Sequence, residues 1–389
     1  MVRSSIVRSS PRGGSAWRVA MPALVAALLA ACAVGPDYVR PTSPEPATFA
    51  RATPAQSAAT PAPADDAFWE RFGDPVLTGL VEEALAANND LRVALSRYDG
   101  ANALLRESKF DQIPTITAHG TASRSRLSAD QAPGVPRDAR QDVDSYDVNA
   151  SATWELDVFG RVRRNVEANR AGAEATANDL AALQVAIVGD VARNYFELRG
   201  LQERLRVARD NAENQRETLR LVQARFDAGR GTEFDTSRAR AQLETTLALV
   251  PALEADVAVA EHRIAVLTGR TPEALIAELD APVALPALPD RIDAGTPGEL
   301  LRRRPDIAAA EERLHAATAR IGVATADLFP RFTLGGLIGS QAGDASALFG
   351  GDSQTGFVAL GIDWSFLDVG RVRARIAAAD ANAEGELAS

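Results

Sequence analysis

The sequence predicts an α+β membrane protein in which long β-strands alternate with unusually long helices. Three features predict this fold class: an N-terminal segment of the kind that directs secretion, regions of strict apolar–polar alternation, and a proline-free stretch over residues 162–226. The chain has 389 residues, 46% hydrophobic and 24% charged, and can therefore bury a sizeable core. Its net charge of −10 would repel a polyanion, which argues against nucleic acid as a partner.

Residues 1–31 have the layout of a secretory signal peptide. Positive charge precedes an apolar run over residues 19–31, which is shorter than the ~20 residues that a membrane-spanning helix needs. The charged part contains Arg3, Arg8, Arg12 and Arg18. We therefore expect the protein to leave the cytoplasm.

The only cysteine, Cys32, directly follows Leu29-Ala30-Ala31, and together they resemble a bacterial lipobox. We expect Cys32 to carry lipid, palmitate or a related acyl chain. The presence of Ala33 after it, in place of aspartate, favours delivery to the outer membrane. An ordinary cleaved signal with a chance cysteine is the alternative. A single cysteine also excludes a disulfide within the chain.

An internal repeat organises the sequence. Residues 89–120 match residues 305–336 at one constant offset, and residues 154–163 match residues 364–373 at another. Each copy therefore reads helix, proline, strand, loop, strand, glycine, helix. Only the loop between the two strands differs in length.

The predicted strands rest on alternation with a period of two residues. The last strand of each copy places apolar side chains on one face and small or polar ones on the other. The apolar faces are Val148, Ala150, Ala152, Trp154 and Leu156 in the first copy and Val358, Leu360, Ile362, Trp364 and Phe366 in the second. Stretches of about 10 residues with this pattern are typical of transmembrane strands between lipid and a wet lumen. A soluble, half-buried sheet is the alternative.

Two strands per copy give four per chain, whereas about eight close the smallest barrel. Open strand edges in lipid would leave backbone N–H and C=O groups without hydrogen bonds. We therefore expect the chain to form a barrel only as an oligomer.

Residues 162–226 predict a helix about 100 Å long, at about 1.5 Å per residue. Its apolar positions recur about every 3.5 residues, as in coiled coils, if Gln215 fills one gap. They are Leu180, Leu183, Ile187, Val191, Tyr195, Leu198, Leu201, Leu205, Ala208, Ala212, Leu219, Val222 and Phe226. A return helix carries the matching stripe of Leu243, Leu247, Val250, Leu253, Val257, Ile264 and Leu267. Pro251 is expected to bend it, and a soluble helical bundle is the alternative.

The turn between these helices has its own signature. Gly229 can end the first helix, and Thr232 can cap the second while Asp235 reciprocates. These features predict a long antiparallel hairpin with a tight tip.

Taken together, the motifs resemble those of the outer-membrane factors, or outer membrane efflux proteins, in the lipoprotein branch that serves RND-type tripartite efflux systems. In chain order they are Cys32-Ala-Val-Gly-Pro-Asp-Tyr38, Phe68-Trp69, Phe72-Gly-Asp74-Pro75, Asn88 with Asp90-Leu91, Trp154-Glu-Leu-Asp-Val-Phe-Gly160-Arg, Arg225-Phe226-Asp-Ala-Gly229 with Thr232, Asp235 and Gln242, and Arg303-Arg304-Pro305-Asp306-Ile307. Each motif is weak alone, but their order, with the repeat between them, is specific.

The resemblance implies a homotrimer. Four strands from each chain would close a twelve-stranded β-barrel, continued by an α-helical coiled-coil barrel through the periplasm. The assembly would be a passive conduit in the outer membrane that exports small toxic compounds. Its partners would be outer-membrane lipid, a periplasmic adaptor (membrane fusion) protein and an inner-membrane RND pump that supplies the energy.

In the same family the tip of the hairpin contacts the adaptor. The corresponding residues here are Gly229, Arg230, Gly231, Thr232 and Asp235. Asp235 either lines the tunnel mouth or serves only as a solvent-facing helix cap.

The expected domains are a signal peptide at 1–31, a lipid-anchored Pro/Ala-rich linker at 32–64, a first repeat at 65–290 and a second repeat at 291–389. The second repeat as given stops shortly after Gly370, so we expect it to lack its terminal hairpin. Residues 381–389 are expected to form a poorer helix than their counterpart. A truncated, non-conducting homologue and a structural coiled-coil lipoprotein are the alternatives to a working channel.

No catalytic, cofactor or metal site is expected. His119, His262 and His315 are scattered without metal-ligand spacing, and no serine elbow is present. The pairs Gly335-Gly336 and Gly350-Gly351 lack the sequence context that phosphate binding requires. The sequence therefore predicts a protein that is not an enzyme.

Overall fold

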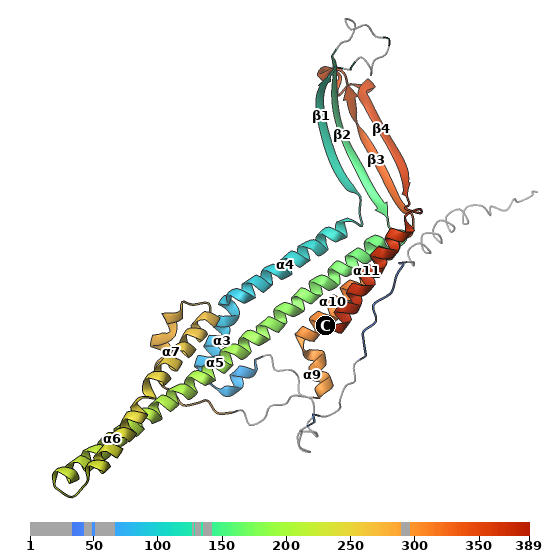
Figure 1. Ribbon diagram of the computed structural model, residues 1–389. Helices are drawn as coiled ribbons and strands as arrows, with labels where there is room; N and C mark the ends of the chain where they lie inside the picture. Colours follow the sequence, from blue (N-terminus) through green and yellow to red (C-terminus); the bar gives the residue numbers. More distant parts are fainter. Residues whose placement is uncertain are drawn as a thin grey trace, which may run out of the picture. The chain divides into compact units, whose positions relative to one another are not determined.

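The computed structural model describes residues 33–42, 49–50, 67–126, 128, 134, 142–288 and 296–389 (Figure 1). The predicted signal peptide, Cys32 and most of the predicted linker lie outside the described residues. The chain divides into two compact units. The sheet unit comprises Met1–Pro41, Gly100–Ala175 and Ala310–Ser389, and the helical unit comprises Thr42–Asp99 and Thr176–Ala309.

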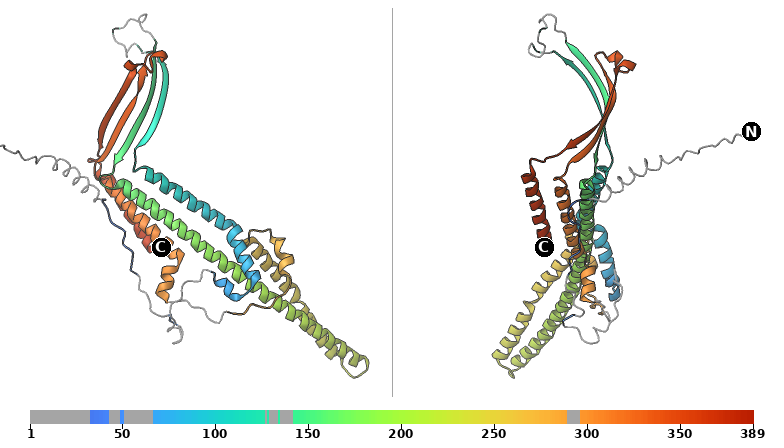
Figure 2. Two further views of the ribbon diagram at one scale, coloured as in Figure 1. Left: turned by 180° about the vertical axis from the view of Figure 1, so that it is seen from behind. Right: turned by 90° about the vertical axis from the view of Figure 1, so that its right-hand side faces the viewer.

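The sheet unit contains one antiparallel sheet in the strand order β1-β2-β3-β4, and Figure 2 shows its twist. The strands are β1 (Thr115–Ser125), β2 (Val143–Leu156), β3 (Arg331–Ala342) and β4 (Gln354–Asp363). In this order β1 and β4 are the two edges of the sheet. The strands lie where the alternation places them.

One expected boundary is wrong. Trp364 and Phe366 lie beyond the end of β4 at Asp363, because the chain turns there, with the Asp368 N–H donating to the Ser365 carbonyl at 3.0 Å. The Trp364 indole N–H donates to the Leu328 carbonyl at 3.1 Å. In the first copy the Trp154 indole N–H donates to the Gln112 carbonyl at the same distance. Each tryptophan thus ties the end of one strand to the start of its partner.

The order helix, strand, strand, helix occurs twice. It runs through α4 (Asn89–Phe110), β1, β2 and α5 (Arg161–Asp227), and again through α10 (Pro305–Ala326), β3, β4 and α11 (Val369–Ala388). The two copies differ at the final glycine. Gly160 precedes α5 with a φ of 79°, whereas Gly370 lies inside α11. The helix continues to Ala388. That residues 381–389 form a poorer helix than their counterpart stays a prediction.

Helices α5 and α11 begin differently because an aspartate occupies a different position before each of them. Asp157 accepts the backbone N–H groups of Val162 and Arg163, both at 2.9 Å, and so caps α5. In the second copy the aspartate stands one place later, at Asp368, and makes no side-chain cap. The first helix therefore has the more sharply defined start.

Among the described residues, the helical unit contains seven complete helices besides part of the long helix α5. They are η1 (Phe68–Phe72), α3 (Pro75–Ala87), α6 (Glu233–Leu247), α7 (Val250–Leu267), η3 (Pro272–Leu275), α8 (Ile276–Leu279) and α9 (Pro297–Arg303). The predicted stripe of α5 is buried over its middle, and α3, α7 and α8 complete the core. Its largest fully buried apolar members are Tyr195, Leu77, Leu198, Ile264, Leu275, Leu279, Val81 and Val191.

The return helix is interrupted rather than bent. Helix α6 ends at Leu247 and α7 begins at Val250, with Pro251 in its first turn. Proline lacks a backbone N–H and is tolerated there, since the first N–H groups of a helix have no partner within it. Among the described residues no helix is long and apolar enough to cross a membrane.

One oxygen of a buried carboxyl in this unit has no hydrogen-bond partner. Glu261 on α7 is only 3% exposed, and its Oε1 is unpartnered. Burial, followed by the nearby Asp280, raises the pKa of the Glu261 carboxyl above its ordinary value of 4.5. The folded protein therefore favours the neutral acid, whereas the unfolded chain ionises Glu261 near 4.5.

Below pH 4.5 the Glu261 carboxyl is neutral in the folded and the unfolded protein, and its contribution to the free energy of unfolding is fully present. This contribution is lost as the pH rises through the raised folded pKa. Glu261→Gln is neutral at every pH. We expect this variant to melt at a higher temperature than the parent near neutral pH and to depend less on pH above 4.5, measured by thermal unfolding in detergent.

Glu254→Gln is the matched control, because Glu254 is an exposed carboxylate on the same helix, 2.7 Å from Arg209. Surface pairs contribute little. Equal pH profiles for the Glu261→Gln and Glu254→Gln proteins would refute the role of burial.

Candidate functional site

The tip of the hairpin is closed by backbone hydrogen bonds. Gly229 has a φ of 69°, a left-handed conformation that glycine adopts without strain. The Arg230 N–H donates to the Arg225 carbonyl at 2.9 Å, and the Gly229 N–H donates to the Phe226 carbonyl at 2.8 Å. These contacts satisfy carbonyls at the end of α5, as in a Schellman motif.

The first turn of α6 carries the predicted capping box. The Asp235 N–H donates to Thr232 Oγ1 at 3.2 Å, and the Thr232 N–H donates to Asp235 Oδ2 at 3.1 Å. The Thr232 hydroxyl also donates to Asp235 Oδ2, and this bond lowers the pKa of that carboxyl. The predicted cap is confirmed, and its carboxylate is ionised and solvent-facing.

The tip also exposes apolar surface that the sequence reasoning missed. Phe234, which follows the cap, is 71% exposed, and Phe226 is partly exposed on the facing helix end. Exposed apolar side chains that occur singly are normal, so Phe234 matters only because it lies beside the predicted tip residues. The signal in the sequence was a phenylalanine two residues after the cap Thr232.

The register of the sheet joins the apolar faces of its four strands. Directly paired residues in an antiparallel sheet share a face. The pairs on the apolar face include Ile116 with Ala152, Ala150 with Ile338, Trp154 with Leu334, Leu334 with Leu360 and Phe332 with Ile362. The opposite face is mostly polar or small, with Leu337 and Phe357 as an apolar pair. The apolar face is largely exposed, as are both edge strands.

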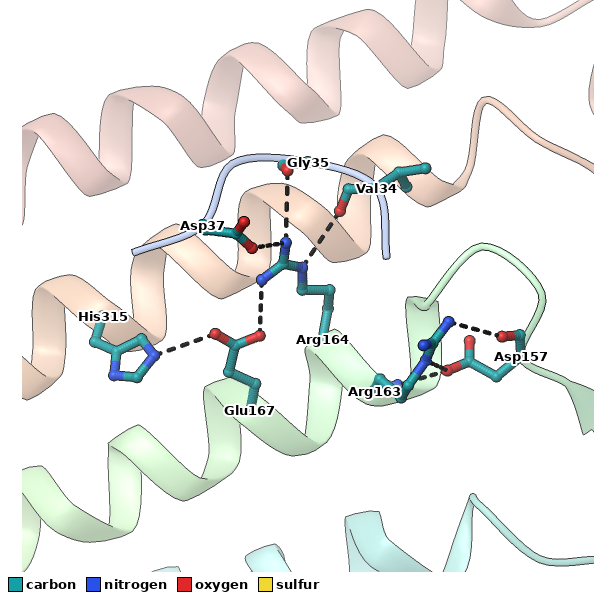
Figure 3. A network of polar contacts seen from close by, with 8 residues as sticks. All are labelled: Val34, Gly35, Asp37, Asp157, Arg163, Arg164, Glu167 and His315. Carbon is teal, nitrogen blue, oxygen red and sulfur yellow. Dashed lines mark hydrogen bonds and ion pairs between the residues drawn. The ribbon is translucent and has the colours of Figure 1, made fainter. Parts of the chain in front are cut away.

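A third candidate region joins residues 33–41, which follow Cys32, to the two helices α5 and α10 (Figure 3). We call the side chains Asp37, Tyr38, Arg164, Glu167 and His315 the Arg164 cluster. Arg164 is 4% exposed. Its Nη2 donates to Asp37 Oδ1 at 2.5 Å, and its Nη1 donates to Glu167 Oε2 at 2.9 Å. One buried guanidinium thus holds two carboxylates.

The cluster continues onto α10. His315 Nε2 lies 3.2 Å from Glu167 Oε1, and the Tyr38 ring stacks on the His315 ring with centroids 4.6 Å apart. Burial raises the pKa of the Tyr38 hydroxyl, and Glu311 and Glu312 raise it further. The segment after Cys32 is therefore held by charge, stacking and backbone contacts at once.

Glycines allow this close approach. A Cβ on Gly160 would lie 2.6 Å from the Ala33 Cα, and a Cβ on Gly322 would lie 2.9 Å from the Arg164 side chain. Gly35, with a φ of 90°, lies against the backbone of Gly322. Larger residues at these positions would push the segment off the helices.

The structure thus separates the predicted site residues. Gly229, Arg230, Gly231, Thr232 and Asp235 lie together at the tip, while Cys32 lies outside the described residues. Arg164, Glu167 and the role of His315 were missed. The available signal was a charged residue at a buried position of α5, between Val162 and Val166.

Within the described residues no group of histidine, cysteine, aspartate and glutamate is arranged to hold a metal ion.

Comparisons with known proteins agree with this architecture. The sequence profile of the outer membrane efflux protein family matches residues 80–270 and 296–389. Nodulation protein T of Rhizobium leguminosarum bv. trifolii is 32% identical over 364 residues, which cover 92% of this chain and 74% of the relative. Outer membrane protein OprJ of Pseudomonas aeruginosa is 32% identical over 376 residues, covering 94% and 75%.

Two further matches are a relative named as a lipoprotein and a solved structure. The probable outer membrane lipoprotein SilC of Salmonella typhimurium is 29% identical over 91% of this chain and 75% of its own length. The solved structure of the outer-membrane channel OprN has a TM-score of 0.83 and 42% identity, covering 92% of this chain and 78% of that one. The chain belongs to the outer membrane efflux protein family.

Proposed function

We propose that the protein is an outer-membrane channel subunit of a tripartite efflux system, a passive conduit for small toxic compounds. The observation that carries this proposal is the four-stranded sheet, with one apolar face, one mostly polar face and two unpaired edges. Such a sheet fits lipid on one side and water on the other only if other copies complete it. Relatives named as outer membrane components of solvent and toluene efflux pumps support the same function.

The proposed assembly is a homotrimer with a twelve-stranded barrel. Three copies of the four described strands suffice to close a barrel with a water-filled lumen. The long hairpin of α5, α6 and α7 would then extend the conduit into the periplasm. An adaptor protein and an inner-membrane RND pump are the proposed partners, and the pump supplies the energy.

Cys32 is the proposed lipid attachment site, and the proposed location is the outer membrane. Residues 65–290 and 291–389 are the proposed repeats, after a signal peptide at 1–31 and a linker at 32–64. A structural coiled-coil lipoprotein or a non-conducting homologue would share the anchor and the helices but would not conduct ions.

The membrane-facing role of the sheet is tested with Leu360→Asp. Leu360 lies on the apolar face of β4 and is exposed. A charge on a lipid-facing strand position is destabilising, by about 2–4 kcal/mol for arginine or lysine near the middle of the bilayer and by less for aspartate. We expect this variant to lose most of the heat-modifiable trimer and of the ion conductance in planar bilayers.

Ala359→Asp is the control, because Ala359 is the neighbouring residue of β4 and points to the opposite face. A wet lumen tolerates this charge, so we expect trimer and conductance near those of the parent. If both variants behave alike, the sheet does not separate lipid from water. If the parent itself neither forms a trimer nor conducts, the channel proposal fails for this chain.

The adaptor contact is tested with Thr232→Ala. Loss of the capping box should let the first turn of α6 fray, with amide exchange at residues 233–236 about fivefold faster. We expect weaker capture of the cognate adaptor by the variant trimer. Thr245→Ala, which removes a hydroxyl bonded to the Ala241 carbonyl on the same helix, is the control. Unchanged adaptor binding despite a frayed tip would rule the tip out as the contact.

A further inference from the structure

The backbone of residues 33–37 makes hydrogen bonds of its own, so both the backbone and the side chains of this segment are held in place. The Val34 N–H donates to the Phe159 carbonyl at 3.1 Å. Arg164 Nε donates to the Val34 carbonyl at 3.3 Å, and Arg164 Nη2 donates to the Gly35 carbonyl at 3.5 Å. With the charge-assisted bond to Asp37, one guanidinium contacts three residues of a four-residue stretch (Figure 3).

The docked segment lies at the boundary between strand and helix. Ala33 packs against Gly160, which stands between the end of β2 at Leu156 and the start of α5 at Arg161. Cys32 directly precedes Ala33 in the sequence, so the proposed point of lipid attachment is one residue away from the docked segment.

Without this docking the tie would be loose. Residues 33–41 can extend to roughly 30 Å, which is about the thickness of the hydrocarbon core of a bilayer. A lipid on such a tether would not fix the depth of the sheet in the bilayer. Two membrane contacts reinforce each other most when the distance between them is fixed, because each then raises the effective concentration of the other.

We propose that Arg164 is a positioning residue for the lipid anchor. It fixes the segment 33–37 on the sheet unit and thereby places acylated Cys32 at the strand–helix boundary, so that lipid and sheet enter the bilayer together. This inference rests on the proposed function, in which Cys32 carries lipid and the sheet spans the membrane. Asp37 and Glu167 bond Arg164 directly, and the Tyr38–His315 stack adds a separate contact between the segment and α10.

The docking itself is measured with Arg164→Met in the full chain. Methionine keeps much of the buried volume and removes the donors. Spin labels on Val39→Cys and Arg320→Cys report the distance between the segment and α10, since both positions are exposed and acylation consumes Cys32. We expect a narrow distance distribution in the parent and a broad one in Arg164→Met. An unchanged distribution would overturn the proposal.

Two further variants separate docking from folding. Asp37→Ala leaves the helices untouched, because the Asp37 side chain is largely exposed, yet it removes the shortest contact of Arg164. We expect it to broaden the distribution as well. Arg170→Met is the matched control, an exposed arginine on the same helix, and should leave the distribution narrow.

The consequence for the membrane is measured as heat-modifiable trimer in outer-membrane fractions. We expect about tenfold less trimer for Arg164→Met than for the parent and no such loss for Arg170→Met. The loss should disappear when both proteins also carry Cys32→Ser, because no lipid remains to be positioned. An equal loss in the Cys32→Ser background would assign Arg164 to helix packing alone and overturn the proposal.

Radioactive palmitate labelling of the parent tests the proposed function separately. Labelling with no effect of Arg164 on trimer yield rejects only the positioning role. Absence of labelling rejects the lipid anchor, and with it the positioning proposal. In that case the distances are measured with Cys32→Ser added, so that only the two introduced cysteines carry a label.

Discussion

The unpaired edges of the four-stranded sheet are the constraint on which the rest of the structure depends. Strands β1 and β4 each present a row of backbone N–H and C=O groups with no partner in the sheet. In water such edges invite other strands, and in lipid they are too costly to leave open. The apolar face adds to this, because exposed isoleucine, leucine and valine side chains need either lipid or protein against them. The homotrimer that we propose would meet both requirements in a bilayer.

The junction below the sheet turns this constraint into a fixed geometry. Asp157 caps α5, Arg161 pairs with Glu155 at the end of β2, and the Phe159 and Phe329 rings stack 4.6 Å apart. In the second copy Asp327 pairs with Arg331 and with Arg375 of α11. Each strand pair is therefore joined rigidly to the helices that follow and precede it within the sheet unit. Residues 33–41 dock on this same junction.

In the helical unit, a motif that contains an aspartate and a glycine contributes to the packing of the core. Asp74, from the motif Phe72-Gly-Asp74-Pro75, caps α3 through the Val76 N–H and also accepts the Tyr195 hydroxyl of α5 at 2.5 Å. Burial, and then this bond, raises the pKa of Tyr195. Arg199, one turn later, is buried against the Tyr195 ring and bonds the Ala281 carbonyl at 2.9 Å. The motif therefore orients α3 on the long helix.

The sequence by itself determined the four strands, the long helix with its apolar stripe, the capped tip and the family, because alternation, coiled-coil spacing and caps are local patterns. It placed Thr232 and Asp235 correctly, since a capping box involves residues only three apart. It misplaced Trp364 and Phe366, whose alternation continues after the backbone has turned. Only the tertiary structure decided the register that unites the apolar faces, the unpartnered burial of Glu261, and the meeting of Asp37, Arg164 and His315. The meeting of Asp37, Arg164 and His315 depends on contacts between residues more than a hundred positions apart in the chain. All three features depend on which segments the fold brings together, and a local sequence pattern does not contain that information.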